Sequence, residues 1–277
     1  MDIIQPFMLE QGLFRGSFIA ADKTIALATG CHTYPDYVNT LIAQMIVTGL
    51  FLSSSIKYQG TFALQLKGDG PVQSVVVEIT HEQQVRAYAR FDETRKPKSA
   101  ALSDTLGNGQ LAFAVSMLGQ EPYQGVVTLN GESLAQTVLN YLNQSEQIST
   151  HLTIREQDGL YRGIFVQQMP AKQDKTPEEQ ADLFETVGVL LHSITNAELF
   201  SDLPVQELLF RLFHANALTV FEGKTPAFCC ACYPDKIKSY LAHFPKEQLE
   251  ELFRDDKIEA QCEFCGQTYT FSRKDFE

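Results

Sequence analysis

The sequence FCCAC at residues 228–232 and the sequence CEFCG at residues 262–266 hold five of the six cysteines in the chain. In each stretch two thiols lie close together, and about thirty residues separate the two groups. Close pairs of soft thiolates suit tetrahedral Zn²⁺, and a shell of four thiolates is a closed site of the structural kind. The two motifs therefore predict one zinc ion per chain. Cys230 and Cys232 with Cys262 and Cys265 offer the four thiols as two close pairs.

Two other cysteines need an interpretation. Cys229 lies three residues before Cys232, so the first group contains a C-x-x-C as well as a C-x-C. Spacing alone slightly favours Cys229 with Cys232, the commoner pairing in zinc ribbons, and leaves the choice between Cys229 and Cys230 open. Cys31 stands alone in the sequence and is expected to be a small buried hydrophobic residue.

The C-terminal stretch, residues 226–277, contains few large apolar residues. A unit of about 50 residues usually needs a metal or disulfides to fold. Structural zinc contributes on the order of 10–16 kcal/mol in small peptides, so loss of the metal should unfold this unit. Thiolates are also the form that oxidants attack, and two close pairs can form two local disulfides as the metal leaves. The sequence therefore predicts a redox-sensitive zinc domain.

Residues 1–172 are expected to form an α+β domain with a mixed sheet. Phe62, Leu64 and Leu66 alternate with smaller or polar residues, as in a strand with one buried face. A helix is expected from Ser133 to Asn143. The predicted strands cover 14–19, 61–66, 74–79, 85–91, 111–117, 126–129, 151–155 and 163–168.

Residues 38–56 carry no charge and are long enough to suggest a membrane span. Several polar residues interrupt the stretch, and its apolar residues recur at helical spacing. We therefore expect a buried core helix and no membrane association. The N-terminal residues show no basic stretch followed by an apolar run, so we expect a cytoplasmic protein without a secretory signal.

Residues 173–225 are expected to form a helical linker. Residues 171–175 are polar and suggest a hinge, and Thr176-Pro177-Glu178-Glu179 is typical of a helix start. Thr195 repeats the capping pattern, and Pro204 begins a further helix. Short amphipathic helices need a surface to cover. They either complete the core or form a detachable cover, and the sequence does not separate these alternatives.

The formal net charge of −12 argues against non-specific binding of nucleic acid and of anionic membranes. A zinc ribbon that binds nucleic acid is one alternative, because Phe264, Tyr269 and Phe271 could stack on bases or fill a small core. A thiol-disulfide exchange protein is the other, although its C-x-x-C usually opens a helix. The six histidines are scattered, and no nucleotide-binding or zinc-protease motif is present. The chain is therefore not expected to be an enzyme.

The chain resembles a known family over nearly its whole length, the thirty-three-kilodalton redox-regulated heat-shock holdases of bacteria. The family signature is C-x-C, about thirty residues, then C-x-x-C-G. Two departures are the cysteine at position 229 and Tyr233-Pro234-Asp235 in place of the commoner Ser-Arg-Glu. Other similar stretches are QLKGDGP at 65–71, GNG at 107–109, YQGVV at 123–127, SEQ at 145–147 and QQMP at 167–170.

The resemblance implies a stress-response chaperone with an inactive, reduced form in which Cys230, Cys232, Cys262 and Cys265 bind Zn²⁺. It implies that oxidation joins Cys230 to Cys232 and Cys262 to Cys265, and that zinc then leaves. The C-terminal unit and the linker would loosen, expose apolar surface and hold unfolding client proteins without ATP. Active forms in the family are homodimers, so a homodimer is expected after oxidation.

Overall fold

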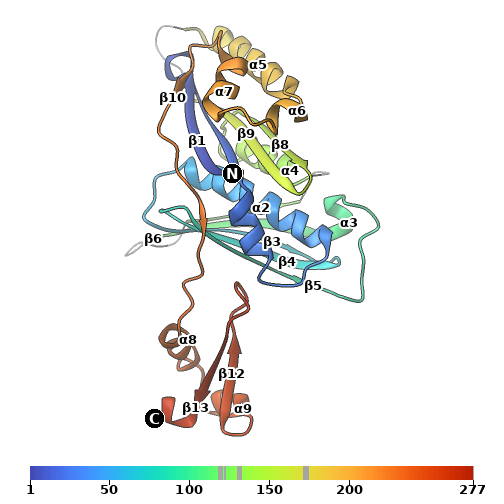
Figure 1. Ribbon diagram of the computed structural model, residues 1–277, viewed down its shortest axis with the longest axis vertical. Helices are drawn as coiled ribbons and strands as arrows, with labels where there is room; N and C mark the ends of the chain where they lie inside the picture. Colours follow the sequence, from blue (N-terminus) through green and yellow to red (C-terminus); the bar gives the residue numbers. More distant parts are fainter. Residues whose placement is uncertain (118–120, 122, 130–132, 171–174, 277) are drawn as a thin grey trace.

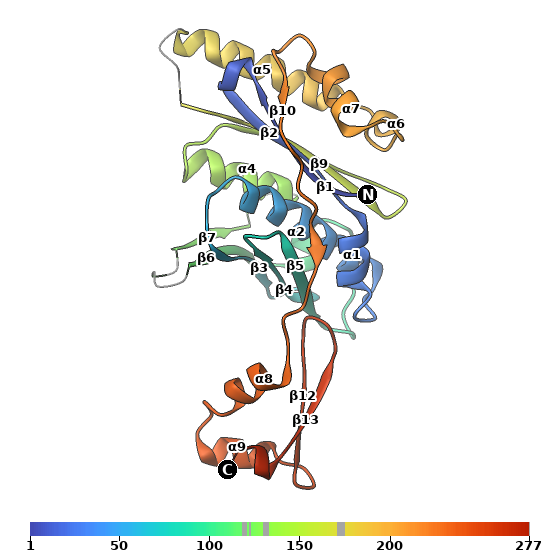
Figure 2. The ribbon, with the colours of Figure 1, turned by 60° about the vertical axis from the view of Figure 1, so that its left-hand side comes forward.

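The fold was analysed in a computed structural model that describes residues 1–117, 121, 123–129, 133–170 and 175–276. Layers are stacked along its long axis: helices, a first sheet, more helices, a second sheet and a small terminal lobe (Figures 1 and 2). The mixture of sheets and helices confirms the predicted α+β class. Most of the hinge expected at 171–175 lies outside the described residues.

Sheet A has five strands in the order β10-β1-β2-β9-β8. All its neighbours are antiparallel, and β1 pairs with β2 from Asp2↔Ala21 to Leu9↔Phe14. Its strands are β1 (Asp2–Leu9), β2 (Phe14–Ala21), β8 (Thr150–Gln157), β9 (Leu160–Gln168) and β10 (Thr219–Val220).

Sheet B has six strands in the order β11-β5-β4-β3-β6-β7. The predicted alternation is confirmed in β3, where Phe62, Leu64 and Leu66 are buried. The strand β11 pairs parallel to β5, and the other neighbours are antiparallel. The strands are β3 (Gly60–Gly68), β4 (Val72–Thr80), β5 (Gln84–Phe91), β6 (Gly109–Met117), β7 (Tyr123–Thr128) and β11 (Ala227–Phe228).

The helices α1 (Asp22–Thr29), α2 (Asp36–Ser54) and α4 (Leu134–Gln144) lie between the two sheets (Figure 2). By length and composition α2 could cross a membrane, but 67% of its apolar window is buried inside the protein. Its side chains join both sheets in one core, which confirms the expected core helix. A short helix, α3 (Leu102–Leu106), precedes β6, and 3-10 turns occupy Glu10–Gly12 and Arg273–Asp275.

Three helices cover the outer face of sheet A: α5 (Pro177–Ser193), α6 (Asn196–Leu199) and α7 (Val205–Phe213). The capping boxes predicted at Thr176 and Thr195 are both present. A second core unites the helices with the sheet, and Phe7 of β1 stacks on Phe213 of α7 with ring centroids 5.5 Å apart. Sheet A is thus the surface that the amphipathic helices need. Both alternatives, a permanent layer and a detachable cover, are compatible with this packing.

A histidine lies at the seam between α5 and β8. His151 stacks on Phe184 with centroids 4.2 Å apart, and Gly188 leaves room for its ring, since a Cβ there would lie 2.4 Å from Nε2. Nε2 is buried without a hydrogen-bond partner. Burial lowers the pKa of His151, nearby Glu185 raises it and His192 lowers it further. The packing therefore favours the neutral ring.

This seam is expected to weaken in mild acid. The unfolded state binds the proton first, near pH 6.5, so stability falls as the pH drops from there towards the lower pKa of the folded state. The loss is at most about 1.4 kcal/mol per unit of pKa depression, and less because the ring is only partly buried. Urea unfolding between pH 7.5 and 5 should show a steeper loss for the natural protein than for His151→Phe. An equal dependence of the unfolding free energy on pH in both proteins would contradict this prediction. His243→Asn, which removes an exposed ring, is the control and should behave like the natural protein.

An extended segment, residues 219–229, which we call the strap, joins α7 to the terminal lobe. Its strands β10 and β11 lie at the edges of sheets A and B. Between them, the backbone of Lys224 exchanges two hydrogen bonds with Ile4, at 2.7 and 2.9 Å. At its end the amide of Cys229 donates to the carbonyl of Val85, 2.9 Å away. The strap therefore ties both sheets to the first cysteine group.

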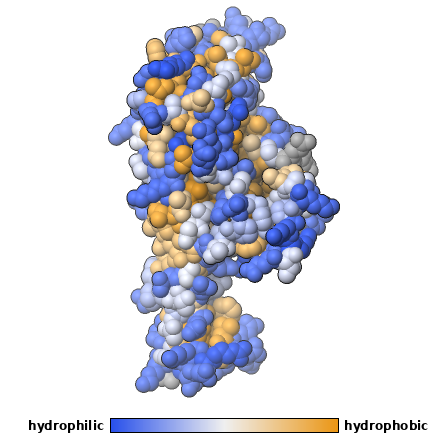
Figure 3. Space-filling view, turned by 45° about the vertical axis from the view of Figure 1, so that its right-hand side comes forward, coloured by the Kyte–Doolittle hydropathy of each residue, from blue (hydrophilic) through white to orange (hydrophobic). Residues whose placement is uncertain are grey.

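The terminal lobe hangs below sheet B on a narrow neck (Figures 1 and 3). Among its described residues, 230–276, three apolar side chains are buried, those of Leu241, Ile258 and Phe271, and partly buried apolar residues pack around them. So few residues make a weak core for a unit of this size. The lobe consists of α8 (Pro234–Leu241), α9 (Lys246–Leu252) and a hairpin of β12 (Lys257–Gln261) and β13 (Thr268–Ser272).

Candidate metal centre

Two backbone segments bring the cysteine groups together. The strap delivers Cys230 and Cys232 immediately before α8, and the turn between β12 and β13 carries Cys262 and Cys265. In this turn the amide of Gly266 donates to the carbonyl of Cys262 at 2.8 Å. Gly266 has φ of +70°, a conformation that glycine adopts without steric cost. The second cysteine pair therefore lies in a tight turn rather than at the start of a helix, where a thioredoxin-type motif would be found.

Four sulfur atoms form a cluster with all distances below 4.8 Å, and they belong to Cys230, Cys232, Cys262 and Cys265. Two contacts join the groups: Cys230 Sγ to Cys262 Sγ is 3.6 Å and Cys232 Sγ to Cys265 Sγ is 3.2 Å. Tetrahedral zinc with bonds of about 2.3 Å requires sulfurs about 3.8 Å apart. The donor type, number and spacing fit a zinc ion, and the exposed thiol of Cys229 lies outside the cluster.

The thiols of the cluster differ in acidity. Burial opposes ionisation of Cys232, but hydrogen bonds from Tyr269 and the neighbouring thiols lower its pKa to about 7. The Tyr269 hydroxyl lies 3.4 Å from its sulfur and 3.0 Å from its carbonyl oxygen. Burial, with Cys232 and Cys262 adding to it and Cys265 opposing it, raises the pKa of Cys230 to about 11, and burial also raises the pKa of Cys265. Without a metal, the cluster therefore favours ionisation of Cys232 over Cys230 and Cys265.

The expectation for Cys31 is wrong in one respect. The residue is only partly buried, and its sulfur donates to the carbonyl of Leu27 at 3.2 Å. Burial raises the pKa of Cys31, and the charge of Cys262 adds to this, so the thiol lies close to the cluster. Its carbonyl oxygen is 3.1 Å from where a Cβ on Gly266 would be. The sequence could not reveal this proximity because more than two hundred residues separate Cys31 from Cys262.

Two residues lie inside the second cysteine pair, Glu263 and Phe264, and we call them the tip. They contact the part of the chain that precedes the strap, residues 1–218, which we call the body. Arg90 Nε donates to Glu263 Oε1 at 2.8 Å, and His32 Nε2 donates to the Glu263 carbonyl at 2.8 Å. The guanidinium of Arg86 lies 4.1 Å from the centroid of the Phe264 ring. Tyr88 meets the same ring edge-on with centroids 4.8 Å apart.

These contacts correct the expectation that Phe264 either fills the lobe or binds bases. Phe271 does fill the core of the lobe, and Tyr269 hydrogen-bonds to Cys232, whereas Phe264 packs on the body. The residues that receive the tip, Arg86, Tyr88 and Arg90, had not been predicted as functional. Nothing in the sequence signals them, because they lie on an ordinary alternating strand far from the cysteines.

Comparison with known proteins agrees with this arrangement. A curated protein from Proteus mirabilis named 33 kDa chaperonin is 34% identical over 279 residues, which cover 99% of this chain and 94% of the relative. A protein of the same name from Nitrosococcus oceani is 33% identical over 277 residues, covering 100% of this chain and 93% of the relative. The crystal structure of the 33 kDa chaperonin of Thermotoga maritima superimposes with a TM-score of 0.83. It covers 99% of this chain and 96% of its own, and at 20% identity it supports the fold alone.

The family profile described as Hsp33 protein matches residues 2–272, which include both sheets, the strap and the cysteine cluster. Because the match and the identities extend over nearly the whole chain, this protein belongs to the Hsp33 family.

Proposed function

We propose that this protein is a redox-regulated holdase chaperone that prevents aggregation of unfolding client proteins without ATP. Its reduced form binds one Zn²⁺ through Cys230, Cys232, Cys262 and Cys265 and is inactive. Oxidation releases the metal and exposes apolar surface, and the oxidised protein acts as a homodimer. Its setting is the cytoplasm under oxidative stress, where reducing conditions otherwise keep thiols free. The names of its relatives, 33 kDa chaperonins, support the chaperone part.

One observation carries the proposal: the four-sulfur cluster joins the end of the strap to a lobe with only three buried apolar side chains. When bound, zinc would hold the cysteines as thiolates and fasten the hairpin to the strap. The weak core would not keep the lobe folded after the metal leaves. The strap pairs with the edges of both sheets, so unfolding of the lobe would loosen the strap where it contacts the body.

The helices at the other end of the strap supply the surface that clients would use. α7 ends at Phe213, only a few residues before the strap begins at Thr219. Under α5 and α7 lie the side chains of Phe7, Phe14 and Phe18, each at most 1% exposed. If the strap loosens, short amphipathic helices lose an anchor, and the apolar face of sheet A becomes accessible.

Oxidation is a balanced two-electron step for each disulfide. A pair of thiolates loses two electrons and forms the S–S bond, and one molecule of hydrogen peroxide accepts the electrons with two protons from the solvent to give two molecules of water. We propose the pairs Cys230–Cys232 and Cys262–Cys265, as the family resemblance implies. With the thiols reduced, sulfurs of different groups lie as close as 3.2 and 3.6 Å, so disulfides between the groups are the alternative that an experiment must exclude.

Peptide mapping of the peroxide-treated protein is expected to show disulfides within the two groups and no disulfide between them. Two atoms of sulfur should be oxidised per disulfide, with one zinc released per chain into a chromogenic chelator. A Cys230–Cys262 or Cys232–Cys265 linkage as the main product would contradict the proposed pairing. Cys229→Ser should give the same map, because its thiol is outside the cluster.

The rival functions give different results in simple assays. A thiol-disulfide exchange protein would reduce insulin with turnover, whereas a holdase would not. A nucleic-acid-binding zinc ribbon would shift single-stranded DNA in a salt-dependent way. The experiment that tests the proposal measures zinc content and suppression of client aggregation in one preparation, before and after oxidation.

A further inference from the structure

The face on which the tip lies is a small recognition surface. Along β5, Val85 and Ala87 are fully buried, while Arg86, Tyr88 and Arg90 alternate with them and point to the outer face of sheet B. His32, from the connection between α1 and α2, adds a further hydrogen-bonding group. Together these residues can pair with a carboxylate and can pack against an aromatic ring, which occupies the part of the surface that we call the seat. We call them the β5 face.

The β5 face is held in place by the body and does not depend on the tip. Glu78 of β4 forms an ion pair with Arg86. His32 packs against Tyr34 with centroids 5.1 Å apart, and the Tyr34 hydroxyl accepts a hydrogen bond from the Ala89 amide at 3.1 Å. Departure of the tip would therefore leave the β5 face formed, with Arg86 still paired to Glu78 and Arg90 without the carboxylate of Glu263.

The tip itself depends on the cysteine cluster. Glu263 and Phe264 stand between two cluster sulfurs, in a turn closed by hydrogen bonds between Cys262 and both Gly266 and Gln267. The direct contacts are individually modest, because water and salt screen the exposed Arg90–Glu263 ion pair and the cation–π contact lies near the surface. The folded lobe holds the tip against the β5 face and gives it a high effective concentration there. Unfolding of the lobe replaces this rigid attachment by a long flexible one and lowers that concentration.

We propose that the β5 face is a docking site for client segments in which an acidic residue adjoins an aromatic one, and that the tip blocks it in the zinc-bound form. The inference rests on the proposed holdase function and identifies a contact by which clients are recognised. Charge complementarity supports this occupant: once the tip departs, Arg90 lacks a carboxylate partner, and Arg86 and Tyr88 remain in place to contact an aromatic ring. The strand edge of β5 next to the seat also becomes free if β11 detaches, and an extended segment can pair there.

A labelled peptide tests the proposal. The peptide carries the sequence of residues 259–268 with serine in place of both cysteines, so that it retains Glu263 and Phe264 but forms no disulfide. In fluorescence anisotropy it should bind oxidised full-length protein at least about tenfold more tightly than zinc-loaded protein. The reason is that the folded lobe holds the competing tip against the β5 face only in the zinc-loaded form. A peptide with Phe264→Ala should lose this binding.

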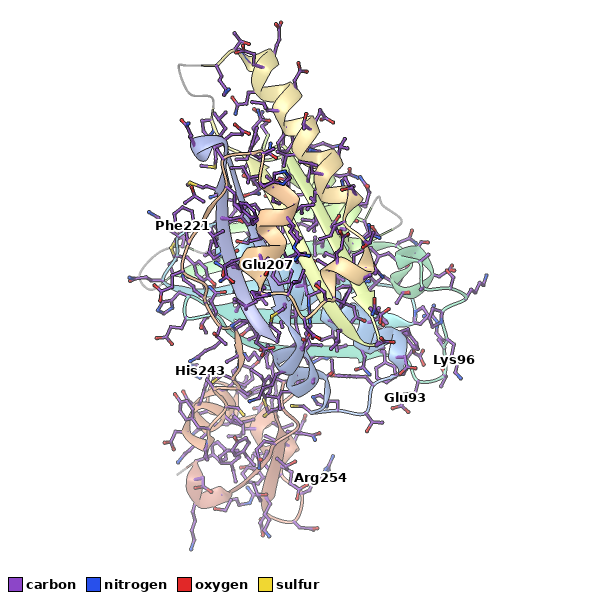
Figure 4. All side chains as sticks on the ribbon, turned by 45° about the horizontal axis from the view of Figure 1, so that its top comes forward. Glu93, Lys96, Glu207, Phe221, His243 and Arg254 are labelled. Atoms are coloured by element: carbon purple, nitrogen blue, oxygen red, sulfur yellow. The ribbon has the colours of Figure 1, made fainter. Side chains whose placement is uncertain are left out.

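Charge reversal locates the contact. Arg90→Glu in the oxidised protein should weaken peptide binding at least about fivefold, and a peptide with Glu263→Lys should restore it. The matched control is Lys96→Glu, which makes the same charge change in the loop after β5, away from the lobe (Figure 4). Circular dichroism of the zinc-loaded variants checks that each one folds. Restoration by the reversed peptide is an outcome that misfolding cannot produce.

The results separate this inference from the proposed function. Equal binding of the peptide to both redox forms overturns the inference, and so does absence of binding to an oxidised protein that suppresses client aggregation. In the second case the holdase proposal stands. If the oxidised protein does not suppress aggregation at all, the holdase proposal fails whatever the peptide does.

Discussion

Peroxide with mild heat is expected to convert a protein that leaves a heat-unfolded client to aggregate into one that suppresses this aggregation without nucleotide. With the thiols reduced, the apolar face of sheet A is covered, since its phenylalanines lie under α5 and α7. Oxidation takes the metal from a lobe whose core contains only three buried apolar side chains. Structural zinc is worth on the order of 10–16 kcal/mol, comparable to or above the stability of a typical domain, so the lobe should unfold completely.

Light scattering of the client, with zinc release followed in parallel, measures this effect. Activity should rise with zinc release, and dithiothreitol with added zinc should reverse both. Reversal is expected because disulfides in such short loops are strained and easily reduced. If zinc-loaded and oxidised protein held clients equally well, the metal would be a structural support and not part of a switch. An oxidised homodimer should appear by sedimentation in the same samples.

The body of the protein was predictable because its elements repeat a local pattern. Each of the eight predicted strands and the helix at α4 is present, with ends that differ by a few residues. The capping boxes at Thr176 and Thr195 were readable because the four residues involved are adjacent in sequence. Strand β1 was not predicted: Pro6 interrupts its pattern, and a proline inside a run usually argues against a strand.

The connections that matter for function were not predictable in the same way. β10 and β11 contain two residues each, too few to show any period, and they form only because the strap follows the sheet edges. The contact of Phe264 with Arg86 and Tyr88 depends on how the lobe sits on the body. Spacing correctly identified two close thiol groups, but it could not choose between Cys229 and Cys230. That choice depends on where the strap leaves sheet B.

A single hydrogen bond marks the point where the strap leaves sheet B. The Cys229 amide donates to Val85, so Cys229 is the last residue held along β5, and its thiol is exposed. Cys230 is the first residue after the strap leaves the sheet, and its sulfur lies 3.6 Å from that of Cys262. Two neighbouring residues with the same side chain therefore occupy different environments, and each is a matched control for the other.

Cys230→Ser is expected to abolish tight zinc binding, while Cys229→Ser should bind zinc like the natural protein. Serine keeps the size of the side chain but replaces a soft thiolate by a hydroxyl, a poor ligand for zinc at neutral pH. Loss of one of four ligands removes a large share of a binding energy on the order of 10–16 kcal/mol, so the affinity should fall by several orders of magnitude. Competition with a chromogenic chelator measures it.

The same pair of variants should differ in the lobe and in activity. Cys230→Ser without bound zinc should show rapid amide hydrogen exchange over residues 230–276 and should suppress client aggregation even when reduced, because its lobe is already unfolded. Cys229→Ser should retain slow exchange and should need oxidant. If Cys229→Ser lost zinc and Cys230→Ser kept it, the commoner C-x-x-C spacing would have been the better guide to the ligands. Equal partial losses in both variants would mean that the two thiols exchange at the metal, which the hydrogen bond between Cys229 and Val85 should prevent.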